Sequence, residues 1–223
     1  MDGAVLFDLD ETLIDRAASS KIYGMQFYSD FNESISALPE AFLESFMRLD
    51  GNGYVPRGEF FQALSENIGP AGPDAYQIAN HFSEYAWTKT VLMDGAQDVL
   101  ERLRTAGFPI GIITNGGSLN QRKKITNSGL DRLVDGIFIS EELGVRKPQP
   151  EIFLGALQRL NAAARQSWFV GDNPDADIAG ASSVGLKTIW LRRSLPWPEH
   201  NATCYTVAID RLEDALNAIF RNA

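Results

Sequence analysis

Short apolar runs without polar alternation recur along the chain, and polar residues follow each one. The first run covers residues 4–7, and comparable runs cover 109–113 and 168–170. A strand buried on both faces has this continuous apolar pattern. Two further strands are predicted at 136–139 and 187–191.

Apolar residues at helical spacing separate these runs. In 99–106 and 152–160 they recur about one turn apart, as in an amphipathic helix. Further helices are predicted over 174–184 and 212–220. Because strands and helices alternate, the sequence predicts an α/β fold with a parallel sheet.

The stretch 16–93 departs from this alternation. Its apolar residues, such as Phe42 and Phe46, have helical spacing, and Pro39 and the segment 51–53 interrupt it. We therefore predict a small helical domain at 16–93, inserted into a core made of 1–15 and 94–223.

One segment of this insert resembles an EF-hand loop, with Gly53 at the position of the sharp turn. Aligned in this way, Arg48 stands where the first carboxylate ligand belongs. We therefore interpret the segment as a turn between two helices.

Composition narrows the classes of protein. The chain has 223 residues, of which 44% are hydrophobic, and this excludes disorder as its main state. A net charge of −9 argues against nucleic acid or an anionic membrane as a partner. The single cysteine, Cys204, excludes an internal disulfide, and its presence with only His81 and His200 argues against structural zinc. Without a signal peptide or membrane span in the sequence, we expect a soluble cytoplasmic protein.

Carboxylates follow two of the predicted strands. Asp8 and Asp10 follow the first, and we expect both to point into one volume. Asp172 follows a later strand, with Asp177 five residues on. Crowded carboxylates raise one another's pKa unless a cation neutralises them, and oxygen ligands with few imidazoles suit Mg²⁺. The alternative for the first pair is two capping residues in a loop.

Groups that suit a phosphate stand before two of the predicted helices. Thr114, Asn115 and Gly116 offer a hydroxyl and backbone N–H groups before a helix, and Lys147 supplies a cation. Taken singly, these residues also fit an ordinary strand-to-helix loop and a surface lysine.

Taken in order, the segments resemble the four motifs of the haloacid dehalogenase-like (HAD) hydrolase superfamily. These segments are 8–12, 114–115, 147–148, and 171–172 together with Asp177. The resemblance extends over residues 4–191 and implies a Rossmann-like parallel sheet. It also implies that the helical insert is a C1 cap, which closes over the site in this family.

The resemblance implies roles for the two leading aspartates and the phosphate-binding groups. Asp8 is expected to be the nucleophile that becomes an aspartyl phosphate, and Asp10 the general acid and base. Thr114 and Lys147 are expected to hold the phosphoryl oxygens, and Thr12 to orient Asp10 by a hydrogen bond.

The resemblance also implies an Mg²⁺ site. Its expected ligands are Asp8, the backbone carbonyl of Asp10, and Asp172, with Asp177 as support. Glu11 stands where many members have Gly, and we interpret it as a subgroup marker.

The resulting hypothesis is a Mg²⁺-dependent phosphatase that acts on a small phosphorylated metabolite. A haloacid dehalogenase, a phosphomutase and a non-enzymatic binding protein are the alternatives. The sequence does not identify the substrate, the cap residues that select it or the oligomeric state.

Overall fold

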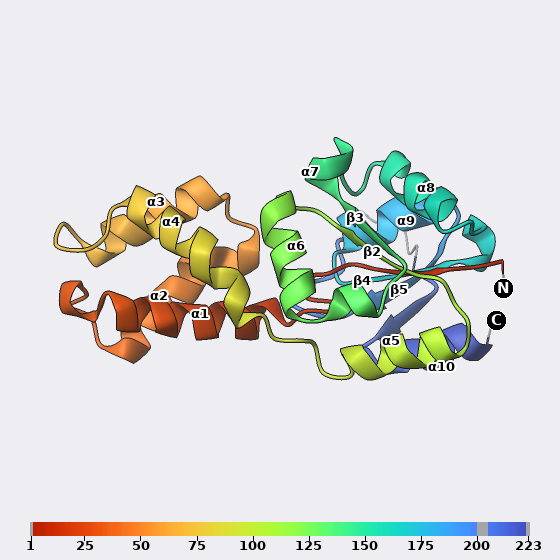
Figure 1. The fold of residues 1–223 in the computed structure, drawn as a ribbon, viewed down its shortest axis with the longest axis horizontal. Helices are drawn as coiled ribbons and strands as arrows, with labels where there is room; N and C mark the ends of the chain where they lie inside the picture. Colours follow the sequence, from red (N-terminus) through yellow and green to blue (C-terminus); the bar gives the residue numbers. More distant parts are fainter. Residues whose placement is uncertain (1, 200–204, 222–223) are drawn as a thin grey trace. The chain divides into compact units, whose positions relative to one another are not determined.

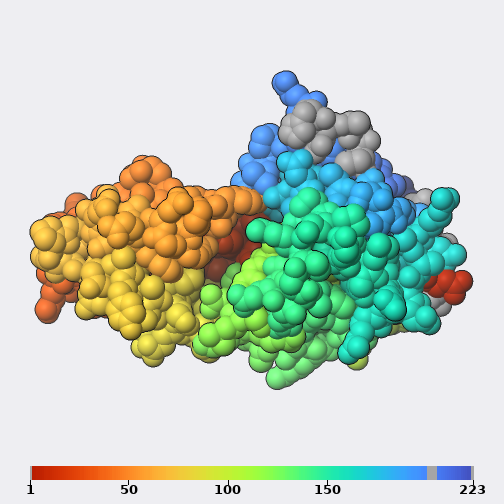
Figure 2. Space-filling model, turned by 90° about the horizontal axis from the view of Figure 1, so that it is seen from above, coloured from red at the N-terminus to blue at the C-terminus, as the bar shows by residue number. Residues whose placement is uncertain are grey.

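The chain forms two compact units in the computed structural model, which describes residues 2–199 and 205–221. The core unit comprises Met1–Asp15 and Leu92–Ala223, and the helical unit comprises Arg16–Val91. Figure 1 shows both as ribbons, and Figure 2 shows the helical unit in orange and yellow on a space-filling surface.

A six-stranded sheet forms the centre of the core unit. Its strands are β1 (Val5–Phe7), β2 (Ile110–Thr114), β3 (Gly136–Ile139), β4 (Trp168–Gly171), β5 (Lys187–Leu191) and β6 (Val207–Ile209). All neighbours pair in parallel, in the order β3-β2-β1-β4-β5-β6. In the register, Phe7 lies between Ile112 and Val170. The carboxyl ends of β1, β2 and β4 therefore meet at one edge of the sheet.

Helices cover the two faces of this sheet. They are α5 (Ala96–Thr105), α6 (Ser118–Asn127), α7 (Ser140–Leu143), α8 (Pro150–Arg159), α9 (Gly180–Ser183) and α10 (Asp214–Arg221). A π-helical segment, Pro174–Ala179, leads into α9, and short 3₁₀ turns lie at Leu130–Arg132 and Ala164–Gln166.

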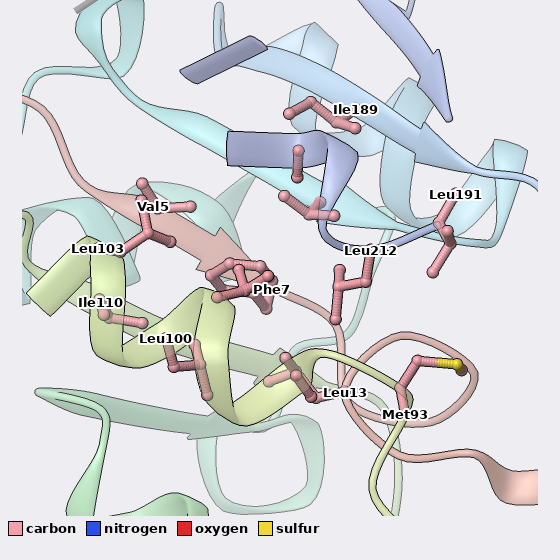
Figure 3. Packing of buried hydrophobic residues seen from close by; sticks show 14 of the residues in the cluster. Val5, Phe7, Leu13, Met93, Leu100, Leu103, Ile110, Ile189, Leu191 and Leu212 are labelled. Atoms are coloured by element: carbon pink, nitrogen blue, oxygen red, sulfur yellow. The ribbon is translucent and has the colours of Figure 1, made fainter. Parts of the chain in front are cut away.

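Alternate residues of β1 enter different hydrophobic clusters. Val5 and Phe7 pack with Leu100 and Leu103 of α5 (Figure 3), whereas Leu6 packs with Phe153 of α8. Because both faces of β1 are covered, its sequence is continuously apolar.

The helical unit contains α1 (Arg16–Asp30), α2 (Pro39–Asp50), α3 (Arg57–Ile68) and α4 (Ala75–Tyr85). Its 3₁₀ turns are Asn32–Ser34, Gly51–Gly53 and Ala86–Lys89. Phe27, Phe42, Phe46 and Phe60 are fully buried and form its aromatic core. No described helix in either unit is long and apolar enough to cross a membrane.

The structure confirms the predicted α/β fold with a helical insertion between β1 and β2. The EF-hand-like segment is a turn between α2 and α3, as interpreted from the sequence. The predicted helix over 174–184 differs, because a π-helical segment occupies its first part. Of the zinc ligands weighed from the sequence, His200 and Cys204 lie outside the described residues.

Candidate active site

A buried lysine lies at the centre of the site. Lys147 lies in the loop between α7 and α8, and its side chain is 2% exposed. Its Nζ lies 2.5 Å from Asp8 Oδ1 and 2.6 Å from Asp177 Oδ1. Burial alone would lower the pKa of Lys147, but these two carboxylates outweigh it and hold that pKa above its ordinary value. The ammonium is therefore charged at neutral pH.

Three buried carboxylates surround this ammonium. One oxygen each from Asp8, Asp172 and Asp177 lies within 4.8 Å of the others. We call these residues the acidic trio. Burial, with the charge of Asp177 adding to it, raises the pKa of Asp8 to about 7 and that of Asp172 to about 9.

The acidic trio has the chemistry of a cation site. Ionising all three carboxylates beside one ammonium would leave two negative charges unbalanced in a buried cluster, and a bound cation would offset them. Asp172 Oδ2 is buried and has no hydrogen-bond partner among the described residues. Oxygen ligands with this charge fit a divalent cation such as Mg²⁺.

Local structure after β4 positions two members of the trio. Trp190 on β5 donates its indole N–H to the Asp172 carbonyl, at 3.0 Å. The Asn173 N–H donates to Asp177 Oδ2, at 3.0 Å. A Cβ on Gly171 would lie 2.6 Å from the Asp177 Cβ, so the absent side chain lets Asp177 approach β4.

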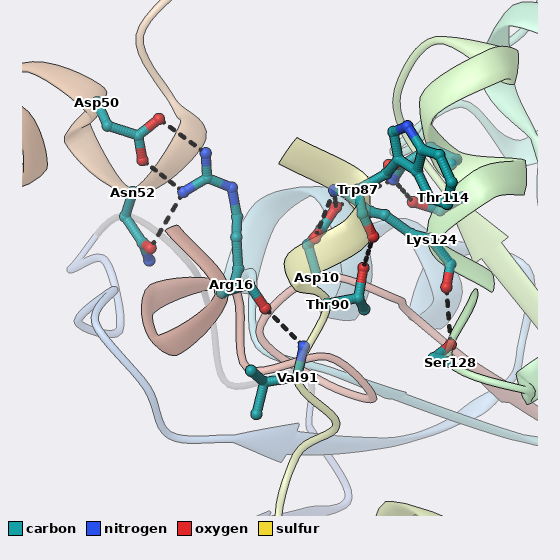
Figure 4. A network of polar contacts seen from close by, with 12 residues as sticks. Asp10, Arg16, Asp50, Asn52, Trp87, Thr90, Val91, Thr114, Lys124 and Ser128 are labelled. Atoms are coloured by element: carbon teal, nitrogen blue, oxygen red, sulfur yellow. Dashed lines mark hydrogen bonds and ion pairs between the residues drawn. The ribbon is translucent and has the colours of Figure 1, made fainter. Parts of the chain in front are cut away.

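The Asp10 carboxylate has partners of its own on α6. It accepts hydrogen bonds from Lys124 Nζ at 2.8 Å to each oxygen, and from Gln121 Nε2 at 3.0 Å (Figure 4). Asp10 is thus not a member of the acidic trio, but its charge still contributes to the raised pKa of Asp8. The expectation that the Asp8 and Asp10 side chains share one volume stays a prediction.

In the loop after β2, Asn115 and Gly116 make hydrogen bonds within the protein, although the sequence suggested contacts to a phosphate. Both ends of the Asn115 amide bond the Lys147 backbone, with Oδ1 accepting from its N–H and Nδ2 donating to its carbonyl, each at 2.9 Å. The Gly116 N–H donates to Ser140 Oγ. These groups therefore hold the site together, and substrate contacts by Asn115 and Gly116 stay a prediction.

Two further residues of the first motif, Glu11 and Thr12, differ in their contacts. Glu11 adopts a positive φ of 64°, and its carboxylate accepts from Arg193 Nε at 3.2 Å. The predicted hydrogen bond from Thr12 to Asp10 is wrong, because the Thr12 hydroxyl is buried with no partner in the described part of the chain.

The structure thus brings Asp8, Lys147, Asp172 and Asp177 together. It adds Gln121, Lys124 and Trp190, which sequence reasoning missed. The spacing of Gln121 and Lys124, one turn apart on the helix after Thr114, could have indicated a shared face toward the site.

Comparison with known proteins identifies the family. The family model for haloacid dehalogenase-like hydrolases matches residues 3–185. The chain belongs to this family. Glyceraldehyde 3-phosphate phosphatase from Pyrococcus abyssi is 33% identical to this HAD-like hydrolase over 227 residues, which is 96% of this chain and 92% of that protein.

Solved structures share the fold of this HAD-like hydrolase. The HAD-hydrolase YfnB from Bacillus subtilis, solved with magnesium bound, is 26% identical with a TM-score of 0.75, covering 97% of this chain and 98% of that one. L-2-haloacid dehalogenase from Xanthobacter autotrophicus has a TM-score of 0.73 at 19% identity, with full coverage of both chains. The second likeness shows the fold alone.

Proposed function

We propose that this HAD-like hydrolase is a Mg²⁺-dependent phosphatase that cleaves small phosphomonoesters through an aspartyl phosphate on Asp8. The observation that carries the proposal is the buried acidic trio around Lys147. A carboxylate nucleophile next to a fixed ammonium suits attack on an anionic phosphoryl group, where positioning and charge stabilisation dominate catalysis.

The first step transfers the phosphoryl group to the protein. A carboxylate oxygen of Asp8 forms a bond to phosphorus while the bond from phosphorus to the leaving oxygen breaks. Asp10 donates its proton to that leaving oxygen, which departs as an alcohol.

The second step restores the enzyme. Asp10, now a carboxylate, takes a proton from water as the water oxygen bonds to phosphorus and the bond from phosphorus to Asp8 breaks. Inorganic phosphate leaves, and both aspartates return to their starting states.

The remaining residues bind charge during both steps. Lys147 stays protonated next to Asp8 and is positioned to pair with a phosphoryl oxygen, and the Thr114 hydroxyl can donate to another. Asp8, Asp172 and the Asp10 carbonyl would hold Mg²⁺, with Asp177 in support. When bound, the ion supplies positive charge that offsets both the acidic trio and the phosphate.

A phosphorylated three-carbon sugar is the substrate class we favour. The support is the relative from Pyrococcus abyssi, whose name is glyceraldehyde 3-phosphate phosphatase and which matches nearly the whole chain. The dehalogenase neighbour shares only the fold, and a halide leaving group needs neither the proton of Asp10 nor a cation at the acidic trio.

A substrate screen tests this function. The purified protein is assayed with three-carbon sugar phosphates, nucleotides, phosphorylated amino acids and a 2-halo acid, each with Mg²⁺ and with EDTA. We expect phosphate release only with Mg²⁺ and most rapidly from the sugar phosphates. Halide release without phosphate release, or full activity in EDTA, would contradict the proposal.

Lys147 provides a variant with a matched control. Lys147→Ala is expected to lower kcat/KM by roughly 10²-fold or more, because it removes the ammonium facing the phosphoryl group. Arg146→Ala removes the neighbouring exposed cation and should leave kcat/KM unchanged.

A further inference from the structure

One face of α6 carries a pair of donors that the reaction described above does not use. Gln121 and Lys124 are three residues apart on α6 and both reach Asp10. The Lys124 ammonium contacts both oxygens of the Asp10 carboxylate at 2.8 Å. Figure 4 shows the lysine side chain extending toward this carboxylate.

This contact differs from an ordinary surface ion pair. The Lys124 and Asp10 side chains are only 23% and 24% exposed, and Gln121 is 3% exposed. Exposed pairs have little orienting effect because solvent screens them and their side chains rotate freely. Here three hydrogen bonds from two side chains fix one carboxylate.

Gln121 also connects Asp10 to Thr114. Its Nε2 donates to Asp10 Oδ2 at 3.0 Å and to Thr114 Oγ1 at 2.7 Å. In the carboxylate form of Asp10, which acts in the second step, the nitrogen must face Asp10, because a carboxylate only accepts hydrogen bonds and an amide NH₂ has one proton for each of the two acceptors. Since the Thr114 oxygen accepts from Gln121, the Thr114 proton is directed at another acceptor.

The chain makes room for this arrangement at Gly116. A Cβ on Gly116 would lie 3.0 Å from the Gln121 Cγ, which is tighter than ordinary van der Waals contact. The loop after β2 therefore accommodates the buried Gln121 amide between Thr114 and Asp10.

The two aspartates of the first motif consequently have separate cations. Lys147 lies against Asp8 and Asp177, and Lys124 lies against Asp10. This separation keeps Asp10 from competing with Asp8 for the same ammonium, so each carboxylate can be oriented for its own step.

We propose that Gln121 and Lys124 are positioning residues that orient the Asp10 carboxylate for proton transfer and tie its placement to the phosphoryl-binding hydroxyl of Thr114. The inference rests on the proposed function. It predicts that the two residues act on catalysis through Asp10, so their contribution depends on whether Asp10 is present.

The test measures kcat and KM of Lys124→Met with an alkyl phosphate and with an activated aryl phosphate, at saturating Mg²⁺. With the alkyl phosphate, kcat should fall about 10²-fold with little change in KM, because the proton donor is misplaced. With the aryl phosphate the loss should be smaller, because this leaving group needs less protonation.

A double-mutant cycle separates action through Asp10 from direct contact with substrate. Asp10→Asn with Lys124→Met should be no slower than Asp10→Asn alone. An equal further loss in the double variant would overturn the inference, because Lys124 would then act on the phosphate itself. Lys124→Arg, which can still donate to both oxygens, should restore most of kcat.

A control variant and the activity of the wild type distinguish the possible outcomes. Arg122→Gln removes a cation from the same helix that pairs with Glu142, and it should leave kcat unchanged. An active wild type whose rate is unaffected by Lys124→Met would overturn this inference alone. A wild type inactive on every phosphomonoester would overturn the proposed function, and this inference with it.

Discussion

Both units of the molecule bury carboxylates, but they balance the charge differently. In the helical unit, Asp50 is 1% exposed and pairs with two arginines. Arg16 donates to its two oxygens at 2.7 and 2.9 Å (Figure 4), and Arg57 donates at 2.7 Å. Burial would raise the pKa of Asp50, but the two guanidinium groups outweigh it and lower that pKa below its ordinary value.

The core unit reverses this balance. Its acidic trio shares one ammonium, and burial raises the pKa of Asp8 and Asp172. The comparison teaches that burial alone does not mark a functional acid. A carboxylate surrounded by enough positive charge stabilises the fold, whereas a cluster left short of positive charge is prepared for a cation and an anionic substrate.

Replacing the nucleophile should cause the largest loss of activity without a loss of stability. Asp8→Asn removes the group that attacks phosphorus, and we expect phosphatase activity to fall at least about 10⁴-fold. The Tm of the metal-free variant should not fall, because the change relieves crowding in the acidic trio while Lys147 keeps Asp177. Assays with an aryl phosphate and thermal melts in EDTA measure both. A large loss of Tm would mean that Asp8 serves mainly as a structural partner of Lys147.

In the helical unit, replacing the buried carboxylate is expected to lower stability. Asp50→Asn leaves the guanidinium groups of Arg16 and Arg57 without their counter-ion, and we expect a destabilisation of about 3–5 kcal/mol in urea unfolding. Glu66→Gln makes the same chemical change at an exposed position of that unit and should change stability by less than about 0.5 kcal/mol. Equal effects for the two variants would show that the Asp50 cluster is not a structural anchor.

Stability should also depend on pH through the acidic trio. Asp8 and Asp172 keep their protons in the folded protein at pH values where the unfolded chain, with a carboxyl pKa near 3.8, has lost them. The folded state then binds more protons, so stability falls as pH rises from about 4 toward 9. In EDTA, we expect Tm to decrease steadily over this range.

Saturating Mg²⁺ should flatten this profile, because a cation bound to the ionised trio offsets its repulsion. Melts at several pH values, with EDTA and with Mg²⁺, provide the comparison. A metal-free Tm that rises steadily toward pH 9 would contradict the charge balance inferred for the core unit.

The smallest effect is expected from the indole that holds the Asp172 carbonyl. Trp190→Phe keeps the ring and loses the N–H donor, so we expect the affinity for Mg²⁺ to fall about tenfold, near 1.4 kcal/mol. Trp197→Phe serves as the control, because it alters a neighbouring ring whose centroid lies 4.9 Å from that of Trp190. Calorimetric titration of both variants with Mg²⁺ measures the difference.

Most of the fold could be predicted from the sequence. Strands buried on both faces have continuous apolar runs, and β1 to β5 were found in this way. The strand β6 was missed because it has only three residues, two of them partly exposed, and its pairing with β5 depends on tertiary contacts. The π-helical segment was missed because apolar spacing does not distinguish it from an α-helix.

The candidate site was less predictable than the fold. Order along the chain indicated Asp8, Lys147 and Asp172, because the two aspartates follow buried strands and the lysine precedes a helix. The direction of the Asp10 side chain depends on partners more than 100 residues away on α6, and motif spacing carries no information on such pairings. The use of Asn115 as a clamp on the Lys147 backbone was hidden for the same reason.

The two glycines that make room for site residues have a consequence for the tolerance of this sequence to mutation. Gly171 leaves space for Asp177, and Gly116 leaves space for Gln121. Even alanine would push against a side chain of the site, although neither glycine carries a functional group. In a deep mutational scan scored by activity, substitutions at these two positions should be as harmful as substitutions of the aspartates. Such a scan alone would therefore not distinguish a residue that leaves space for the site from one that takes part in the reaction.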